Sequence, residues 1–160
     1  MTQIRLQSGY CIDTCALIDF GESYFQDIFP GLWGDMERLA IDGLLIAPTE
    51  VYKEIARTYD GEIQRWTRQH KEMFIELDDE QIREVKAIEK RFGNLIDPDK
   101  TIPDADPFLI ALAKSRGNWT VVTQEKPSTK LKPKIPDVCQ ILGIPCVNLY
   151  NFFKKCDWKY

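Results

Sequence analysis

The stretch YCIDTCALIDF, residues 10–20, decides the fold that this sequence predicts. Residues 10–12 are typical of a buried strand, and residues 14 to about 25 have the spacing of a helix. Asp13 lies at the junction between them. Because the carboxyl ends of parallel strands border the crevice where ligands bind, Asp13 is a candidate site residue. The structural alternative for Asp13 is an N-cap of the following helix.

The composition limits the class of protein. With 160 residues, 44% of them hydrophobic and 29% charged, the sequence predicts a single globular domain over residues 1–160. Its apolar runs are shorter than the roughly 18 residues of a membrane-spanning helix, and the first residues lack the apolar region of a secretory signal. We therefore expect a cytoplasmic protein with no membrane partner. The net charge of −4 argues against broad coating of nucleic acid but leaves room for a local basic patch.

Cysteine and histidine give no sign of a metal site. The five cysteines form no C-x-x-C pair, so neither a disulfide framework nor a zinc site is indicated. His70 is the single histidine, and its helical spacing from Trp66 and Met73 favours a position in or at the edge of the core. Any metal site in this chain is therefore expected to use oxygen ligands.

The remaining segments alternate between helix and strand patterns. They predict a helix over 32–43, a strand over 44–47, a helix over 48–59, helices over 61–74 and 79–92, a strand that ends near residue 123, and a final helix, strand and helix over 136–155. Such alternation predicts an α/β fold with a central parallel sheet flanked by helices on both faces. The helices over 61–74 and 79–92 are interpreted as a helical lobe at about 60–95.

Two glutamates lie on the helix that begins at Pro48. On a helical wheel Glu50 shares the polar face with Lys53 and Arg57, which predicts a solvated surface acid. Glu54 falls at the boundary of the apolar face, from which it can lean over the sheet edge toward Asp13. Glu54 is therefore the second candidate acid, with a surface ion pair as the alternative.

A third acid precedes a buried helix. In DADPFLIALA, Asp106 stands before Pro107, which fits an N-cap followed by proline at the first helical position. The helix behind Asp106 is apolar nearly all round, so its N-terminus is expected at the edge of the core. Asp104, two residues earlier, can reach the same space.

The strand in NWTVVTQE, residues 118–125, ends near Thr123 and delivers a fourth acid, Glu125. It is followed by KPSTKLKPKIP, residues 126–136, a basic loop without an acid that carries Lys126, Lys130, Lys132 and Lys134. Directly after a carboxylate, these lysines are well placed to hold phosphates. A solvated loop is the alternative.

The candidate acids come from separate segments and are expected to converge at one end of the sheet. Several carboxylates in one crevice repel one another unless a cation neutralises them. An all-oxygen set suits Mg²⁺ or Mn²⁺, and a water bound to such an ion is a nucleophile for attack on phosphorus. The residues themselves therefore favour metal-dependent chemistry on a phosphate substrate.

In this order, the phrases IDTCALID, PTEVYKEI, DADPFLIALA and VVTQE resemble the PIN-domain nucleases. The residues from Trp66 onward and KIPDVC with its basic loop are similar to a toxin-like (VapC-like) branch of that family, the DUF4411 group. The resemblance implies a PIN-like domain that hydrolyses RNA with Mg²⁺ or Mn²⁺. Because many such proteins are toxins of bacterial toxin-antitoxin pairs, it also implies a small antitoxin protein as partner. A homodimer is a further expectation.

The resemblance also assigns roles to residues. It implies Asp13 as the first metal ligand, Glu54 as the second acid, Asp106 as the third, and Thr14 and Thr123 as positioning hydroxyls. From the residues themselves we add Glu125 to the catalytic set, Asp104 to the metal ligands, and Lys126, Lys130, Lys132 and Lys134 as RNA-binding residues. The sequence departs from the family at the fourth acid, since members often have Thr-x-Asp where this chain has Thr123-Gln124-Glu125. Direct ligation by Glu125 is therefore open, and Asp104 is an additional acid that suits a second ion.

Two alternatives to a nuclease remain. One is a PIN-like module that binds nucleic acid or protein without catalysis. The other is a different Mg²⁺-dependent phosphotransfer enzyme of TOPRIM-like type, with Asp104 and Asp106 as its D-x-D, although such a site requires glutamate where this chain has Asp13. Neither G-x-x-x-x-G-K-[ST] nor G-x-G-x-x-G occurs, so the sequence does not support a nucleotide cofactor.

Overall fold

The computed structural model describes residues 8–58, 61–93, 105–128 and 133–160. Within these residues the sheet consists of β1 (Tyr10–Ile12), β2 (Leu45–Pro48), β3 (Phe74–Ile75), β4 (Thr120–Val122) and β5 (Cys146–Val147). The strand order is β3-β2-β1-β4-β5, and all neighbouring strands are parallel. The predicted parallel sheet is confirmed, with β1 at its centre.

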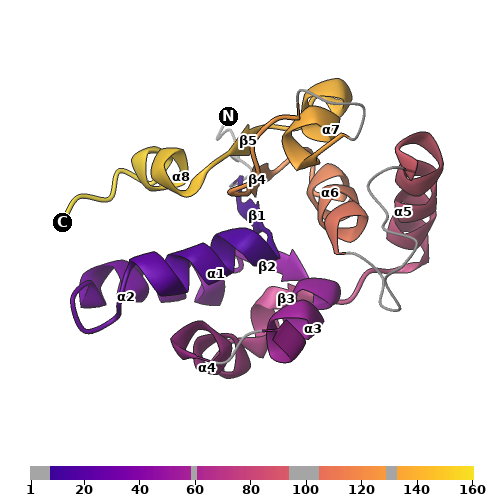
Figure 1. The fold of residues 1–160 in the computed structure, drawn as a ribbon. Coiled ribbons are helices and arrows are strands. Elements are labelled where there is room, and N and C mark those ends of the chain that lie inside the picture. The colour runs from indigo at the N-terminus through magenta and orange to yellow at the C-terminus, as the bar shows by residue number, and fades with distance from the viewer. Residues whose placement is uncertain (1–7, 59–60, 94–104, 129–132) are drawn as a thin grey trace, which may run out of the picture.

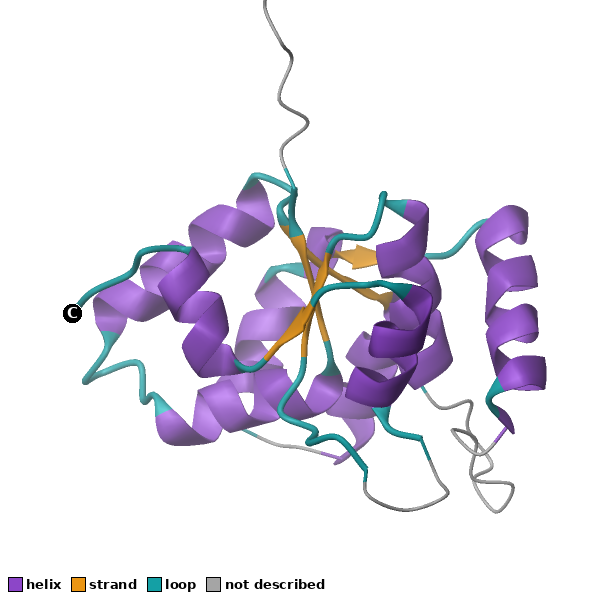
Figure 2. Ribbon diagram, turned by 90° about the horizontal axis from the view of Figure 1, so that it is seen from above, coloured by secondary structure: helices purple, strands orange, loops and turns teal. Residues whose placement is uncertain are grey.

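Helices cover both faces of the sheet (Figures 1 and 2). One face packs against α1 (Thr14–Ser23), α2 (Pro30–Ile41), α3 (Thr49–Thr58), α4 (Glu62–Gln69) and α8 (Leu149–Lys155). The other face packs against α5 (Asp79–Arg91), α6 (Asp106–Ser115) and α7 (Ile135–Leu142). The predicted α/β architecture with helices on both faces is therefore confirmed.

Alternation of side chains along the central strands explains these layers. In β1, Cys11 belongs to the hydrophobic cluster beneath α6, whereas Ile12 belongs to the cluster beneath α1. Val121 and Val122 of β4 divide in the same way, and all four side chains are fully buried. A strand that is apolar on both faces requires a cover on each side, which is why these strands read as continuous apolar runs.

The segment predicted as one helix over 61–74 differs in the structure. Helix α4 ends at Gln69, a 3₁₀ turn (η1, Lys71–Met73) follows, and β3 joins the edge of the sheet. Trp66 and Met73, which suggested a single helical face, are both buried, but they belong to different elements. His70 lies between them, is 7% exposed and packs against Trp66 at a tilt, with 4.5 Å between ring centroids, in agreement with its predicted core position.

The helices predicted as a lobe at about 60–95 pack into two different layers. Helix α4 contacts α1 and α3, whereas α5 contacts α6 on the other side of the sheet. Helices α1 and α4 pack very closely, since a Cβ on Gly21 of α1 would lie 2.8 Å from the Cβ of Ile63 on α4. The division of residues 1–160 into one domain with a lobe stays a prediction.

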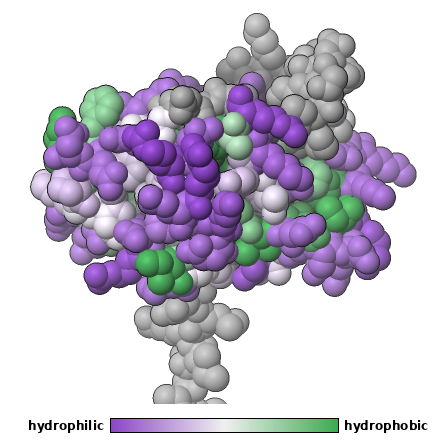
Figure 3. Space-filling view, turned by 90° about the horizontal axis from the view of Figure 1, so that it is seen from below, coloured by the Kyte–Doolittle hydropathy of each residue, from purple (hydrophilic) through white to green (hydrophobic). Residues whose placement is uncertain are grey.

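The surface in Figure 3 is mostly hydrophilic, and the apolar side chains on that face form separate patches. The large apolar side chains that are most exposed in the described residues are Phe25, Ile28, Ile41, Ile141, Tyr150 and Tyr160. None of the described helices is long and apolar enough to cross a membrane.

Candidate functional site

The candidate acids follow the carboxyl ends of the central strands. Asp13 comes directly after β1, Thr123 directly after β4, and α3 with its two glutamates directly after β2. Because these strands are parallel neighbours, their ends lie at one edge of the sheet. The topology therefore brings these segments to the same side of the molecule.

Asp13 is almost completely buried, with 3% of its surface exposed. Its Oδ1 atom accepts the backbone N–H of Ala16 at 2.8 Å, so Asp13 is the N-cap of α1. This was the alternative that the sequence offered to a role in the site. The Oδ2 atom of Asp13 accepts a short hydrogen bond from the Thr123 hydroxyl. The Cys15 thiol lies 3.1 and 3.3 Å from the two oxygens. The carboxylate is thus held in one orientation from α1 and from β4.

Burial raises the pKa of Asp13 from 3.8 to about 6. Hydrogen bonds from Thr123, Ala16 and Cys15 favour the charged form, but they only partly offset the desolvation, and the negative charge of Glu125 adds to the rise. Burial and the Asp13 carboxylate in turn raise the pKa of the Cys15 thiol to about 12, so Cys15 remains a hydrogen-bond donor at neutral pH. A buried carboxylate with a raised pKa at a strand end has the character of a functional group.

Thr123 connects Asp13 with the fourth candidate acid. While its hydroxyl donates to Asp13, its Oγ1 atom accepts the backbone N–H of Glu125 at 3.0 Å. The Glu125 carboxylate accepts the backbone N–H of Ile135 at 3.1 Å, at the first residue of α7. Glu125 is therefore close enough to Asp13 to affect its pKa, while one of its oxygens caps a helix.

Glu54 contacts the beginning of α6, the helix that carries Asp106. The Oε1 atom of Glu54 accepts the backbone N–H of Ala105 at 2.9 Å, one residue before Asp106. The prediction that Asp106 is the N-cap is wrong: Ala105 is the N-cap, Asp106 the first helical residue and Pro107 the second. Because a carboxylate from α3 satisfies an N–H group at this helix end, the Asp106 side chain is not required as the cap.

The structure thus connects Asp13 with Glu125 through Thr123, and it places Glu54 against Ala105, the residue before Asp106. Nowhere in residues 8–58, 61–93, 105–128 and 133–160 do three histidine, cysteine, aspartate or glutamate side chains lie close enough to hold one metal ion. Asp104 lies outside the described residues. The donor chemistry nevertheless fits Mg²⁺ or Mn²⁺, since each predicted ligand supplies carboxylate oxygen. Within the described part of the chain, the Thr14 hydroxyl next to Asp13 is buried without a hydrogen-bond partner.

Glu50 is not the solvated surface acid that the helical wheel predicted. The residue is half-buried, and its Oε2 atom is buried without a hydrogen-bond partner among the described residues. Burial is the largest cause that raises the pKa of Glu50, Lys53 lowers it, and the charge of Glu76, just beyond β3, raises it further. Lys53 and Arg57 are exposed as predicted. Glu50 therefore lies near the same strand ends as the candidate acids.

Two further residues contact the candidate site, and the sequence did not single them out. Cys15 lies on the first turn of α1, which Asp13 caps, so its proximity follows from the two-residue spacing. Gln124 joins three elements, because its amide nitrogen donates to Asp19 of α1 at 2.6 Å and its amide oxygen accepts the N–H of Leu149 of α8 at 2.9 Å. The sequence signal that could have identified Gln124 is its position between two candidate site residues, Thr123 and Glu125.

The basic loop is described only at its ends. Lys126 and Lys134 are exposed, whereas Lys130 and Lys132 lie outside the described residues. The backbone N–H groups of Ser128 and Lys134 donate to Asp137 at 2.9 and 2.8 Å, which lowers the pKa of this carboxyl. Asp137 therefore anchors both described ends of the loop to α7.

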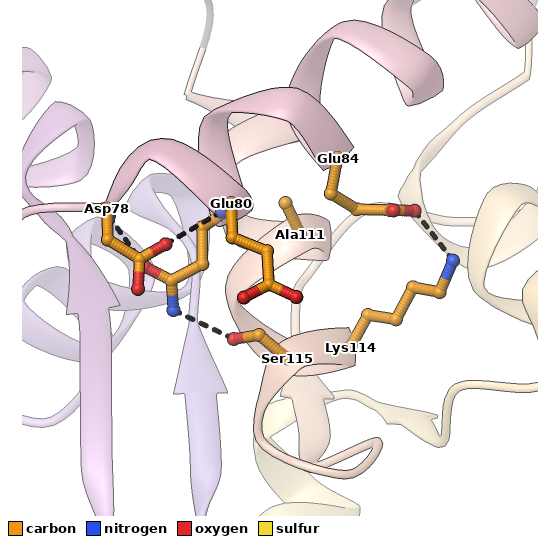
Figure 4. Close-up of a pocket in the computed structure, with 7 residues that line it drawn as sticks. Asp78, Glu80, Glu84, Ala111, Lys114 and Ser115 are labelled. Carbon is orange, nitrogen blue, oxygen red and sulfur yellow. Dashed lines mark hydrogen bonds and ion pairs between the residues drawn. The ribbon is translucent and has the colours of Figure 1, made fainter.

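A cavity of about 350 Å³ lies away from these acids, between the start of α5 and the end of α6. Figure 4 shows Glu84 of α5 bonded to Lys114 of α6, and the same pair is 2.6 Å apart. Gln81 donates to the Ser115 hydroxyl at 2.9 Å. These polar contacts join the two helices, so a role in helix packing explains them.

A family model described as "Domain of unknown function (DUF4411)" matches residues 10–160. The chain belongs to this family. Among curated proteins, none matches the chain. Among solved structures, the DUF4411 chain resembles a chain in the crystal structure of VapBC2 from Rickettsia felis bound to a DNA fragment from their promoter. The TM-score is 0.51 and the identity 12%, and the match covers 87% of this chain and 97% of that chain.

These comparisons confirm the predicted membership of the DUF4411 group and the VapC-like PIN fold. At 12% identity the structural likeness concerns the fold. The roles of individual residues in this DUF4411 protein rest on the contacts described above.

Proposed function

We propose that this DUF4411 protein is a Mg²⁺- or Mn²⁺-dependent endoribonuclease of the PIN type and the toxin of a toxin-antitoxin pair. The observation that carries the proposal is the environment of Asp13. This carboxylate is buried at the end of the central strand, held by Thr123, and has a pKa raised to about 6. On a VapC-like PIN fold, this environment supports a catalytic role.

In this proposal Asp13, Glu54 and Asp106 would hold the metal ion once it draws their carboxylates together, because among the described residues they do not form such a cluster without it. Asp104 would serve a second ion. A bound ion would supply an acidified water as nucleophile and stabilise negative charge on the phosphate. Thr123 keeps the Asp13 oxygens oriented, and Glu54 stabilises the start of the helix that carries Asp106. Thr14 and Glu125 complete the polar surroundings of Asp13, and the lysines from Lys126 to Lys134 attract the RNA backbone.

The test is cleavage of a labelled single-stranded RNA by the purified protein with Mn²⁺ or with a chelator. Asp13→Asn should reduce the rate by about 100-fold or more, since it removes a carboxylate that would hold the cation needed to stabilise the negative charge of the transition state. Asp42→Asn, an exposed change at the end of α2, should cleave like the wild type. Calorimetry should show Mn²⁺ binding that is lost in Asp13→Asn, and undiminished cleavage by that variant would remove Asp13 from the mechanism.

The same assay separates the nuclease from a non-catalytic binding module. RNA binding by the wild type with no cleavage at any Mn²⁺ or Mg²⁺ concentration would favour the module. The toxin role has a separate test, because it concerns a partner. Co-expression with the product of a small neighbouring reading frame should restore growth to cells in which the protein arrests growth. Growth arrest that persists with every neighbouring product would contradict the pairing.

A further inference from the structure

A second cavity, of about 320 Å³, adjoins the candidate site at the carboxyl ends of β4 and β5. Thr123 and Glu125 line this cavity. The Thr123 hydroxyl also donates to Asp13, so one residue connects the cavity with the buried carboxylate. Its volume lies at the small end of the range for ligand pockets, roughly 300 to 1,000 Å³.

The walls of this cavity combine apolar and amide groups. Pro127, Pro136 and Val147 supply apolar surface, and Asn148 and Asn151 supply side-chain amides. Asn148 uses its amide oxygen to accept the Asn151 N–H at 2.9 Å. The exposed Asn151 side chain has no hydrogen-bond partner within the described part of the chain, so it can offer both a donor and an acceptor.

The cavity also has a cation at its edge. Lys126 lines it and is exposed, and it directly follows Glu125. The Glu125 carboxylate accepts the Ile135 N–H. Among the described residues Lys126 takes part in none of the ion pairs. An exposed ammonium group beside a partly apolar cavity suits a ligand that carries a phosphate on a flat, partly apolar body.

We infer that this cavity binds one unstacked nucleotide of single-stranded RNA, adjacent to the phosphate that is cleaved. The base lies between the proline rings and Val147, Asn151 reads its edge, and Lys126 contacts its phosphate. Recognition of single strands commonly relies on splayed bases with hydrogen bonds to their edges, and a duplex cannot place one base in so small a cavity. The inference rests on the proposed function and adds a base preference to it.

The test measures binding of the four RNA homotetranucleotides (A, C, G and U) in chelator, where no cleavage occurs. Asn151→Ala should reduce the affinity difference between the best and worst tetranucleotide by about fivefold or more. Lys126→Gln should weaken all four alike and reduce the log-log salt slope by about 0.7. The matched controls are Gln140→Ala and Lys155→Gln, which change exposed residues outside the cavity and should bind like the wild type.

A second measurement does not depend on variants. Cys146 lines the cavity and is half-buried, whereas Cys156 is half-buried near the end of α8. The best tetranucleotide should slow alkylation of Cys146, mapped by mass spectrometry, and leave Cys156 unaffected. Equal alkylation of Cys146 with and without RNA would overturn the inference.

The outcomes also separate this inference from the proposed function. Wild-type affinity and ranking in both Asn151→Ala and Lys126→Gln, together with Mn²⁺-dependent cleavage, would overturn the cavity alone. Base-selective binding that is lost in Asn151→Ala, without cleavage at any metal concentration, would retain the cavity and reject the nuclease. Absence of binding by the wild type in chelator would overturn the inference whatever the cleavage result.

Discussion

Asp13 carries its charge in a place that water hardly reaches. Its pKa is raised from 3.8 to about 6, a difference of about two units, and each unit corresponds to 1.36 kcal/mol. Above pH 6 the folded state therefore holds an ionised group that the unfolded state solvates better. The metal-free protein should lose about 3 kcal/mol of stability through this group as the pH rises from 4 to 7.

Asp13→Asn removes this charge and should be more stable than the wild type at pH 7.5 in chelator. The difference should shrink as the pH falls through 6 and disappear below about 3, because the wild-type carboxyl is then protonated in both states. Urea unfolding at several pH values measures it. Asp137→Asn is the control of opposite sign, because the pKa of Asp137 is lowered. This variant should be less stable than the wild type at neutral pH, and the difference should shrink as the pH falls below 4. A pH-independent difference for Asp13→Asn would contradict the burial effect.

Glu54 combines a structural contact with a proposed metal contact, and two substitutions separate them. Gln at position 54 keeps an oxygen for the Ala105 N–H but removes the charge, whereas Ala removes both. Glu54→Gln should therefore fold normally and cleave RNA about 100-fold more slowly or worse. Glu54→Ala should in addition lose roughly 1 to 3 kcal/mol of stability. Glu80→Gln, on an exposed residue of α5, is the matched control.

At the scale of elements, Gln124 fastens the end of β4 to α1 and α8. Gln124→Ala removes two hydrogen bonds, one of them to a carboxylate, so it should cost about 2 kcal/mol of stability. Hydrogen exchange should accelerate at the Leu149 amide, which loses its acceptor, and remain unchanged at the Ala16 amide. Equal protection of Leu149 in both proteins would show that α8 is held by its apolar face alone.

Local pattern is sufficient to predict most elements and the place of Asp13. The position of Asp13 depends on a strand and a helix that are consecutive in the chain, so neighbouring residues are enough to predict the junction at residue 13. The wrong predictions involve distant partners. The sequence around Asp106 suggests a cap of α6, but the acceptor at that helix end, Glu54, comes from 51 residues earlier. The helical wheel predicts that Glu50 faces solvent, but the charge of Glu76 acts on it from just beyond β3. This edge strand has only two residues, so it shows no periodicity from which it could be predicted.

At the scale of the molecule, the basic loop opposes a net charge of −4. We expect the triple change Lys130→Gln, Lys132→Gln, Lys134→Gln to weaken RNA binding and to reduce the log-log salt slope by about 0.7 for each phosphate that a lysine no longer neutralises. Mn²⁺ affinity should stay nearly constant, because the acids and the lysines have separate roles. An unchanged salt slope would place the RNA backbone on another face.

The position of β1 in the middle of the sheet has a consequence for synthesis of the chain. Its neighbour β4 comes more than 100 residues later, and the hydrogen bond from Thr123 to Asp13 spans 110 residues. Contacts of such long range form late, because a large loop must close before they contribute. On the ribosome, a nascent chain that has not yet exposed residue 123 has Asp13 on an unpaired strand edge without its hydroxyl partner. The candidate site is therefore completed only when most of the polypeptide has emerged.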